Sequence, residues 1–75
     1  MTNKTYLSTN AQFILDDIDE LPDGHHLESA SEEQILTAIR ALEDGEYLAH
    51  MGYTDDDTPY VEEAYGALQA ALENF

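Results

Sequence analysis

The sequence predicts an all-α fold, a small bundle of three main helices with a short fourth segment. Three stretches carry apolar residues at the spacing of one helical face. A residue typical of helix N-caps precedes each stretch, and no stretch has a confident strand partner elsewhere in the chain. The chain is expected to form one domain, residues 1–75, close to the lower size at which a single core suffices.

Residues 10–21 form the first predicted helix. Asn10 can cap its N-terminus, and Pro22 and Gly24 lie where it should end. Its apolar face would contain Ala11, Ile14, Leu15, Ile18 and Leu21. The preceding residues 1–9 have few large apolar groups, and we expect them to form an extended arm over one end of the core.

Residues 31–44 form the second predicted helix. A capping box of Ser31 with Gln34 can begin it, and the same pattern also starts at Ser29. Its buried face would contain Ile35, Ala38, Ile39 and Leu42. Gly45 is expected to take the left-handed conformation of a C-terminal stop.

Residues 46–53 fit two patterns. Alternate residues from Tyr47 to Tyr53 share a face at a period of two, whereas Tyr47 and Met51 share one at the helical period. We expect a short helix or turn, because a strand here would lack a clear partner. The alternative is an α+β fold in which this segment pairs with residues 5–8.

Residues 58–75 form the most regular predicted helix, against which the rest should pack. Thr58 can cap it with its hydroxyl, and Pro59 occupies the first helical position, where its missing N–H costs nothing. Its apolar stripe consists of Val61, Ala64, Tyr65, Leu68, Ala71, Leu72 and Phe75.

Charge is the outlying property of this chain. Seventeen Asp and Glu residues stand against Lys4 and Arg40, which gives a formal net charge of −15. Such a surface repels nucleic acid and anionic membranes and attracts basic proteins. We therefore expect a basic protein as the partner, with no direct binding to nucleic acid and no membrane association.

Cysteine is absent, which excludes disulfides, thiolate nucleophiles and cysteine-type zinc sites. No apolar run approaches the ~20 residues of a membrane span, and no signal peptide is recognisable. We expect a soluble, cytoplasmic protein. Dimerisation would stabilise so short a chain, so a homodimer is an alternative to a monomer.

Neither a metal site nor catalysis is expected. An EF-hand calcium loop aligned with Gly24 at its sixth position would place Leu21 and Ala30 where oxygen ligands are required. The three histidines form no pair at helical spacing. The serines begin helices, and a core of this size leaves little room for a substrate pocket. We predict no cofactor and no enzymatic activity.

The acidic residues at predicted helix C-termini indicate a contact surface. Carboxylates near helix N-termini are stabilised by the helix dipole by roughly 0.3–1 kcal/mol each, but Asp19, Glu20 and Glu43 would lie at the opposite ends. Tyr53 adds an aromatic residue of the kind enriched in interfaces. The predicted partner-binding residues are Asp16, Asp17, Asp19, Glu20, Asp23, Glu43, Asp44, Glu46, Tyr53, Asp55, Asp56 and Asp57.

Rows of carboxylates on rigid helices can stand in for nucleic-acid phosphates in a Lys/Arg groove. A small, cysteine-free and very acidic domain resembles phage-encoded inhibitors that mimic DNA, among them anti-CRISPR proteins. The segment LEDGEYLAHMG, residues 42–52, is similar to the end of one anti-CRISPR family. The resemblance implies an inhibitor, acting in the cytoplasm of an infected bacterium, that binds the DNA-binding surface of a CRISPR–Cas complex.

Two other segments resemble a different family. SASEEQILTAI (residues 29–39) and DDDTP (residues 55–59) are similar to parts of the four-helix immunity proteins that neutralise DNase bacteriocins. The paired tyrosines of that family are missing here, because Tyr47 and Tyr53 are six positions apart. This resemblance implies an immunity protein that neutralises a basic nuclease.

A third interpretation of the charge involves no partner. Proteins of salt-loving organisms replace lysine with Asp and Glu over the whole surface. Acidic residues spread evenly around the fold would favour this salt adaptation, whereas one continuous acidic strip would favour mimicry of nucleic acid.

Overall fold

The computed structural model describes residues 7–75, which contain four α-helices and no strand. The helices are α1 (Thr9–Asp16), α2 (Glu32–Glu43), α3 (Gly45–His50) and α4 (Thr58–Leu72). Two 3₁₀ turns, η1 (Leu27–Ser29) and η2 (Asp55–Asp57), lie in the connections. The predicted all-α class is confirmed, and the α+β alternative is wrong as far as the described residues extend. The arm expected at residues 1–9 falls mostly outside them.

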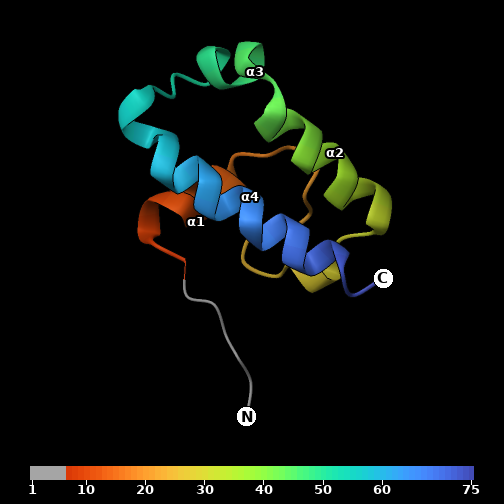
Figure 1. Cartoon of the computed structure of the whole chain (residues 1–75). Coiled ribbons are helices and arrows are strands. Elements are labelled where there is room, and N and C mark those ends of the chain that lie inside the picture. Colours follow the sequence, from red (N-terminus) through yellow and green to blue (C-terminus); the bar gives the residue numbers. More distant parts are fainter. Residues whose placement is uncertain (1–6) are drawn as a thin grey trace.

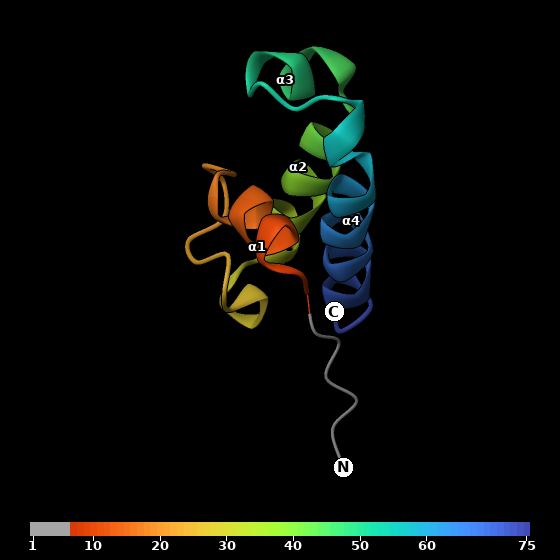
Figure 2. The same cartoon turned by 90° about the vertical axis from the view of Figure 1, so that its left-hand side faces the viewer.

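Helix α4 is the element on which the others pack, as the regularity of its sequence predicted. Both α2 and α1 pack against it, and η1 contacts it as well (Figures 1 and 2). Helix α3 follows α2 directly and lies at the end of the molecule where α4 begins (Figures 1 and 2). No helix within residues 7–75 is both long and apolar enough to cross a membrane.

The core forms where α1, α2 and α4 meet. Its largest fully buried side chains are Leu15, Ile18, Ile35 and Leu68. The predicted stripe of α4 supplies Ala64 and Leu68 to this core, with its other apolar residues half-buried around them. Phe75 is the exception, because α4 ends at Leu72 and the Phe75 side chain is 61% exposed beyond that end.

The first helix is shorter than predicted and begins earlier. Ser8, and not Asn10, is its N-cap, since the Ser8 hydroxyl oxygen accepts a hydrogen bond from the Ala11 N–H at 3.2 Å. After Asp16 the chain continues in tight turns that keep Ile18 and Leu21 buried. Such turns bring residues three apart to the same side, so the apolar spacing persists although the α-helix has ended.

Gly24 explains how the chain can fold back against the end of α1. A methyl group at this position would lie 2.8 Å from the backbone nitrogen of Asp16 and 2.9 Å from the carbonyl carbon of Leu15. The Gln12 side chain then donates a hydrogen bond to the Gly24 carbonyl at 2.8 Å. Only a residue without a side chain allows this close backbone contact.

The start of α2 is the capping box of Ser31 and Gln34, which resolves the two alternatives at this point. Its end differs from the prediction. Gly45 does not take a left-handed conformation but begins α3, because the Asp44 carboxylate accepts a hydrogen bond from the Glu46 N–H at 2.9 Å and caps the new helix. The short helix predicted in residues 46–53 is confirmed.

Gly52 is the residue that takes the left-handed conformation, with φ at 84°. It follows α3, and the Tyr53 N–H then donates to the Leu48 carbonyl at 3.0 Å, as in a helix C-terminal stop. This reversal brings Tyr53 back toward the body of the molecule.

The N-terminus of α4 also differs in detail from the prediction. Thr58 is the first helical residue and does not cap the helix, whereas Pro59 lies in the first turn as predicted. The capping box is one turn earlier, where the Asp57 carboxylate accepts a hydrogen bond from the Thr54 N–H at 2.9 Å. The η2 turn leads directly into α4.

Replacing Gly66 with alanine is expected to stabilise the protein by about 0.5–1 kcal/mol. Gly66 lies inside α4 with a negative φ, and a methyl group there would meet no other atom within 4 Å. Alanine limits the unfolded chain more than glycine does, so the helix loses less entropy on folding. Urea unfolding would measure the gain. Gly52→Ala is the matched control and should destabilise, because its φ is positive.

Candidate functional site

Three segments separated in the sequence meet at one surface, which we call the acid–tyrosine site. The turn after α1 supplies Asp17, Asp19 and Glu20, α3 and the residue after its stop supply Tyr47 and Tyr53, and η2 supplies Asp57. The Tyr53 hydroxyl donates a hydrogen bond to Asp17 Oδ2 at 3.3 Å across 36 positions of sequence. The turn after α1 and helix α3 lie on the same side of the molecule (Figure 2).

Burial and the nearby carboxylates raise the pKa values of both tyrosines. Burial, the charge of Asp17 and the hydrogen bond to it raise the pKa of Tyr53 to about 12, with a smaller contribution from the Asp57 charge. Burial and the charges of Glu20, Asp19 and Asp17 raise the pKa of Tyr47 above its ordinary value. Both phenols are therefore neutral near pH 7 and remain hydrogen-bond donors beside negative charge.

Two carboxylates of this site have no structural task. Asp17 is held by Tyr53 and Asp57 by Thr54, but Asp19 and Glu20 are exposed and make no hydrogen bond or ion pair with another residue of the 7–75 region. The site thus combines oriented acids with acids that are available to an external cation.

Two of the predicted partner-binding acids belong to a different cluster. His25 Nδ1 lies 3.2 Å from Asp16 Oδ1 and 3.9 Å from Asp23 Oδ1, where a protonated ring forms ion pairs. Asp23 also accepts a hydrogen bond from the His25 N–H at 2.9 Å. In the predicted helix 10–21, Asp16 and Glu20 would be one turn apart, but α1 ends at Asp16 and the helix does not extend to Glu20.

The acids at the end of α2 have structural roles, which contradicts the argument that they break a local rule without compensation. Asp44 caps α3, and Glu46 lies in the first turn of that helix, where the helix dipole stabilises negative charge. Glu43 accepts a hydrogen bond from the Tyr65 hydroxyl at 2.5 Å, and this bond contributes most to the raised pKa of Tyr65. The expectation that negative charge is unfavourable at the end of α2 does not hold, because α3 begins directly after α2 ends.

Asp55 and Asp56 complete the predicted set. Both are exposed on η2, next to Asp57 of the acid–tyrosine site. Tyr47, which belongs to the site, and Phe13, one turn before Asp17, were not among the predicted contacts. Tyr47 is half-buried and packs against the core, as its helical spacing suggests, whereas Phe13 is 59% exposed. The sequence signal for Phe13 is its place close to the polar face of the predicted helix 10–21.

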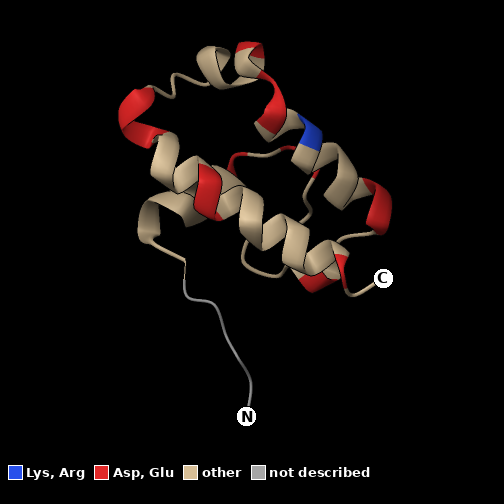
Figure 3. Ribbon diagram, viewed as in Figure 1, with Lys and Arg blue, Asp and Glu red and all other residues tan. Residues whose placement is uncertain are grey.

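Acidic residues also occur far from the acid–tyrosine site. Figure 3 shows them at η2, on the first turn of α2 at the opposite end of the molecule, on α4 and at the α2–α3 junction. Arg40 is the one Lys or Arg residue in the described part of the chain. The acids form several groups instead of one continuous strip.

The chemistry available at the acid–tyrosine site is the binding of cationic groups. Within residues 7–75, no three His, Cys, Asp or Glu side chains are placed to hold a metal ion together. The exposed carboxylates can accept hydrogen bonds from Lys or Arg. The half-buried tyrosine rings beside them can stack on the same cationic groups.

No protein-family model matches this chain, and neither does any curated protein or solved structure at a significant level.

The raised pKa of Tyr53 predicts that stability falls at high pH. The phenol has a pKa of 10.0 in the unfolded chain and about 12 in the folded one, so its stabilising contribution is complete below pH 10 and is lost as the pH rises through 12. We expect the free energy of unfolding to decrease less over this range in Tyr53→Phe than in the wild type. Urea unfolding at a series of pH values measures this difference, and parallel pH profiles would contradict it.

Proposed function

We propose that this domain is a non-catalytic acidic inhibitor that binds the cationic, nucleic-acid-binding surface of a protein partner. The observation that carries the proposal is the acid–tyrosine site, in which Asp17, Asp19 and Glu20 gather beside Tyr47 and Tyr53. The carboxylates would occupy the positions of phosphates, and the tyrosines would pack on Arg or Lys side chains.

The charge of the whole chain supports the same mechanism. A net charge of −15 accelerates the approach to a basic surface and repels free nucleic acid from the inhibitor. A cationic surface that binds the phosphates of DNA cannot bind DNA and this domain at the same place, so the two should compete. A CRISPR–Cas complex and a basic DNase are partners of the proposed kind.

Competition with DNA tests the proposal. The domain would be titrated into fluorescently labelled duplex DNA bound to a CRISPR surveillance complex, a single-protein CRISPR effector or a bacteriocin-type DNase. We expect DNA to be displaced from one of them, less efficiently as salt rises. Polyglutamate of equal charge is the control and should displace DNA more weakly. A ternary complex with DNA, or no binding to any of these in dilute buffer, would refute the proposal.

Salt adaptation is the second candidate function, and the dispersed acids favour it. Figure 3 shows acidic residues at both ends of the molecule, and those at the start of α2 do not belong to the acid–tyrosine site. In this case the surface charge serves solubility in concentrated salt and needs no partner.

Thermal unfolding as a function of KCl concentration separates the two functions. Self-repulsion of a −15 chain is screened by salt, so the melting temperature is expected to rise with KCl in either case. As an inhibitor, the domain should already be folded in dilute buffer, with a helical circular dichroism spectrum. Folding that begins only at molar KCl would assign the acids to salt adaptation.

A further inference from the structure

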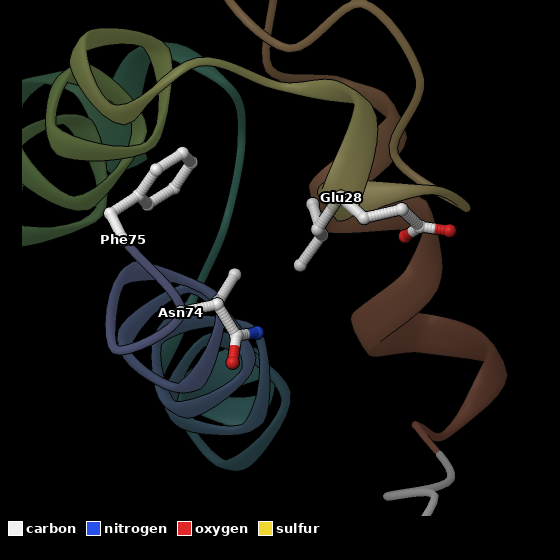
Figure 4. Close-up of a pocket in the computed structure, with 5 residues that line it drawn as sticks. Glu28, Asn74 and Phe75 are labelled. Atoms are coloured by element: carbon white, nitrogen blue, oxygen red, sulfur yellow. The ribbon is translucent and has the colours of Figure 1, made fainter.

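A groove with an apolar floor runs along α4, on its side facing α1 and η1. Its larger part has a volume of about 750 Å³, with Leu15, Leu27 and Ala67 among its lining residues. A second hollow of about 270 Å³ shares Leu27 and Glu28 with it and extends to Phe75. Figure 4 shows Glu28 on one side of this second hollow and Asn74 and Phe75 on the other. We call the two together the α4 groove.

The dimensions of the α4 groove suit a helix. From Glu62 to Leu72, α4 rises by about 15 Å, the length of roughly three helical turns. Gly66 and Ala70 are exposed and line the larger hollow, so a second backbone can approach α4 closely. The space above Gly66 is open, since a methyl group there would contact nothing within 4 Å. Phe75, 61% exposed, offers an aromatic contact at the far end.

Charge decides which kind of helix fits. Glu28, Glu62 and Glu63 all line the larger hollow and are exposed. Glu63 already accepts a hydrogen bond from the Ser8 N–H at 3.0 Å, which leaves the Glu62 carboxylate available. A second copy of this chain would bring another −15 charges to this acidic rim and be repelled. An apolar floor between carboxylates is complementary to a helix with one apolar and one basic face.

We propose that the α4 groove binds a cationic amphipathic helix of a partner protein. The apolar side chains of that helix lie over Leu27 and Ala67, which are half-buried, and its Lys or Arg residues meet Glu28 and Glu62. The α4 groove shares no residue with the acid–tyrosine site, so this binding does not depend on the proposed inhibition of a nucleic-acid-binding protein.

A synthetic peptide tests the α4 groove directly. The probe is a fluorescein-labelled peptide of about 15 residues, four turns, with Leu and Lys at helical spacing. A peptide of the same composition in scrambled order keeps the charge and loses the apolar face. Fluorescence anisotropy is expected to show binding to the probe at least about tenfold tighter, or about 1.4 kcal/mol, than to the scrambled peptide. Equal affinities would mean attraction by charge alone and would overturn the proposal.

Substitutions that fill the groove locate the binding. Gly66→Leu and Ala70→Leu add side chains to exposed positions of α4 and should leave the helical spectrum intact, yet each is expected to weaken probe binding about tenfold. Asp17→Asn, on the acid–tyrosine site, is the control and should leave the preference for the probe over the scrambled peptide unchanged. If Asp17→Asn removes the preference for the probe over the scrambled peptide and Gly66→Leu does not, the proposal is overturned.

Two other occupants of the groove are tested by the same assay. Removing residues 1–6, which include Lys4, is expected to leave probe affinity unchanged; a gain of about tenfold would make this segment the occupant of the groove. Sedimentation of the wild type is expected to show no dimer that forms through the groove. A dimer through the groove would be recognised because Gly66→Leu abolishes it. Such a dimer would make a second copy the occupant and overturn the proposal.

Discussion

Leu68→Ala is expected to lower the free energy of unfolding by about 2–5 kcal/mol. Leu68 is fully buried on α4, the helix that packs against both α1 and α2. Truncation there removes apolar contacts with two helices and leaves a cavity that rigid neighbours fill only in part. A domain of this size has a total stability of roughly 4–11 kcal/mol, so the substitution removes a large share of it.

Urea unfolding followed by circular dichroism measures this effect. Gln69→Ala is the matched control, since Gln69 is exposed on the next position of the same helix and alanine is a strong helix former. We expect the control to change stability by less than about 0.5 kcal/mol. A similar result for Leu68→Ala would mean that α4 does not pack as described.

Neutralising the acid–tyrosine site is expected to weaken binding to a basic partner about tenfold or more. The variant combines Asp17→Asn, Asp19→Asn and Glu20→Gln. Exposed carboxylates paired with Lys or Arg contribute roughly 0.2–1 kcal/mol each, and about 1.4 kcal/mol corresponds to a factor of ten. The affinity should also depend less steeply on salt, because fewer charges take part in binding.

The DNA-displacement assay described above gives the affinity at several salt concentrations. The control variant is Glu32→Gln, Glu33→Gln and Glu73→Gln, which removes the same charge from the start of α2 and the turn after α4. We expect this control to retain most of the affinity. Equal losses in the two variants would mean that net charge acts without a defined site, which favours salt adaptation.

The structural roles of two predicted contact residues, Glu43 and Asp44, have a common physical origin. Both lie at the end of the predicted helix 31–44, where the dipole of that helix alone disfavours negative charge. Asp44 instead caps the next helix, and Glu43 accepts a hydrogen bond from Tyr65, 22 positions away. A rule that considers one helix at a time cannot include stabilisation from a neighbouring element.

The α-helices themselves could be predicted well because their signals are local. The apolar spacing of Ile35 to Leu42 and the capping box at Ser31 lie within a few residues of each other, and the structure reproduces both. The end of the first helix could not be predicted in the same way. Ile18 and Leu21 keep helical spacing while the chain follows tight turns, so the pattern does not distinguish the two.

By itself the sequence determined the all-α class, the order of the helices and the excess of negative charge. These properties depend on composition and on interactions between residues a few positions apart. The tertiary structure alone decided which acids share a surface with Tyr47 and Tyr53, and which part of α4 remains uncovered. Both depend on contacts such as that between Tyr53 and Asp17, which join residues 36 positions apart and leave no periodic trace in the sequence.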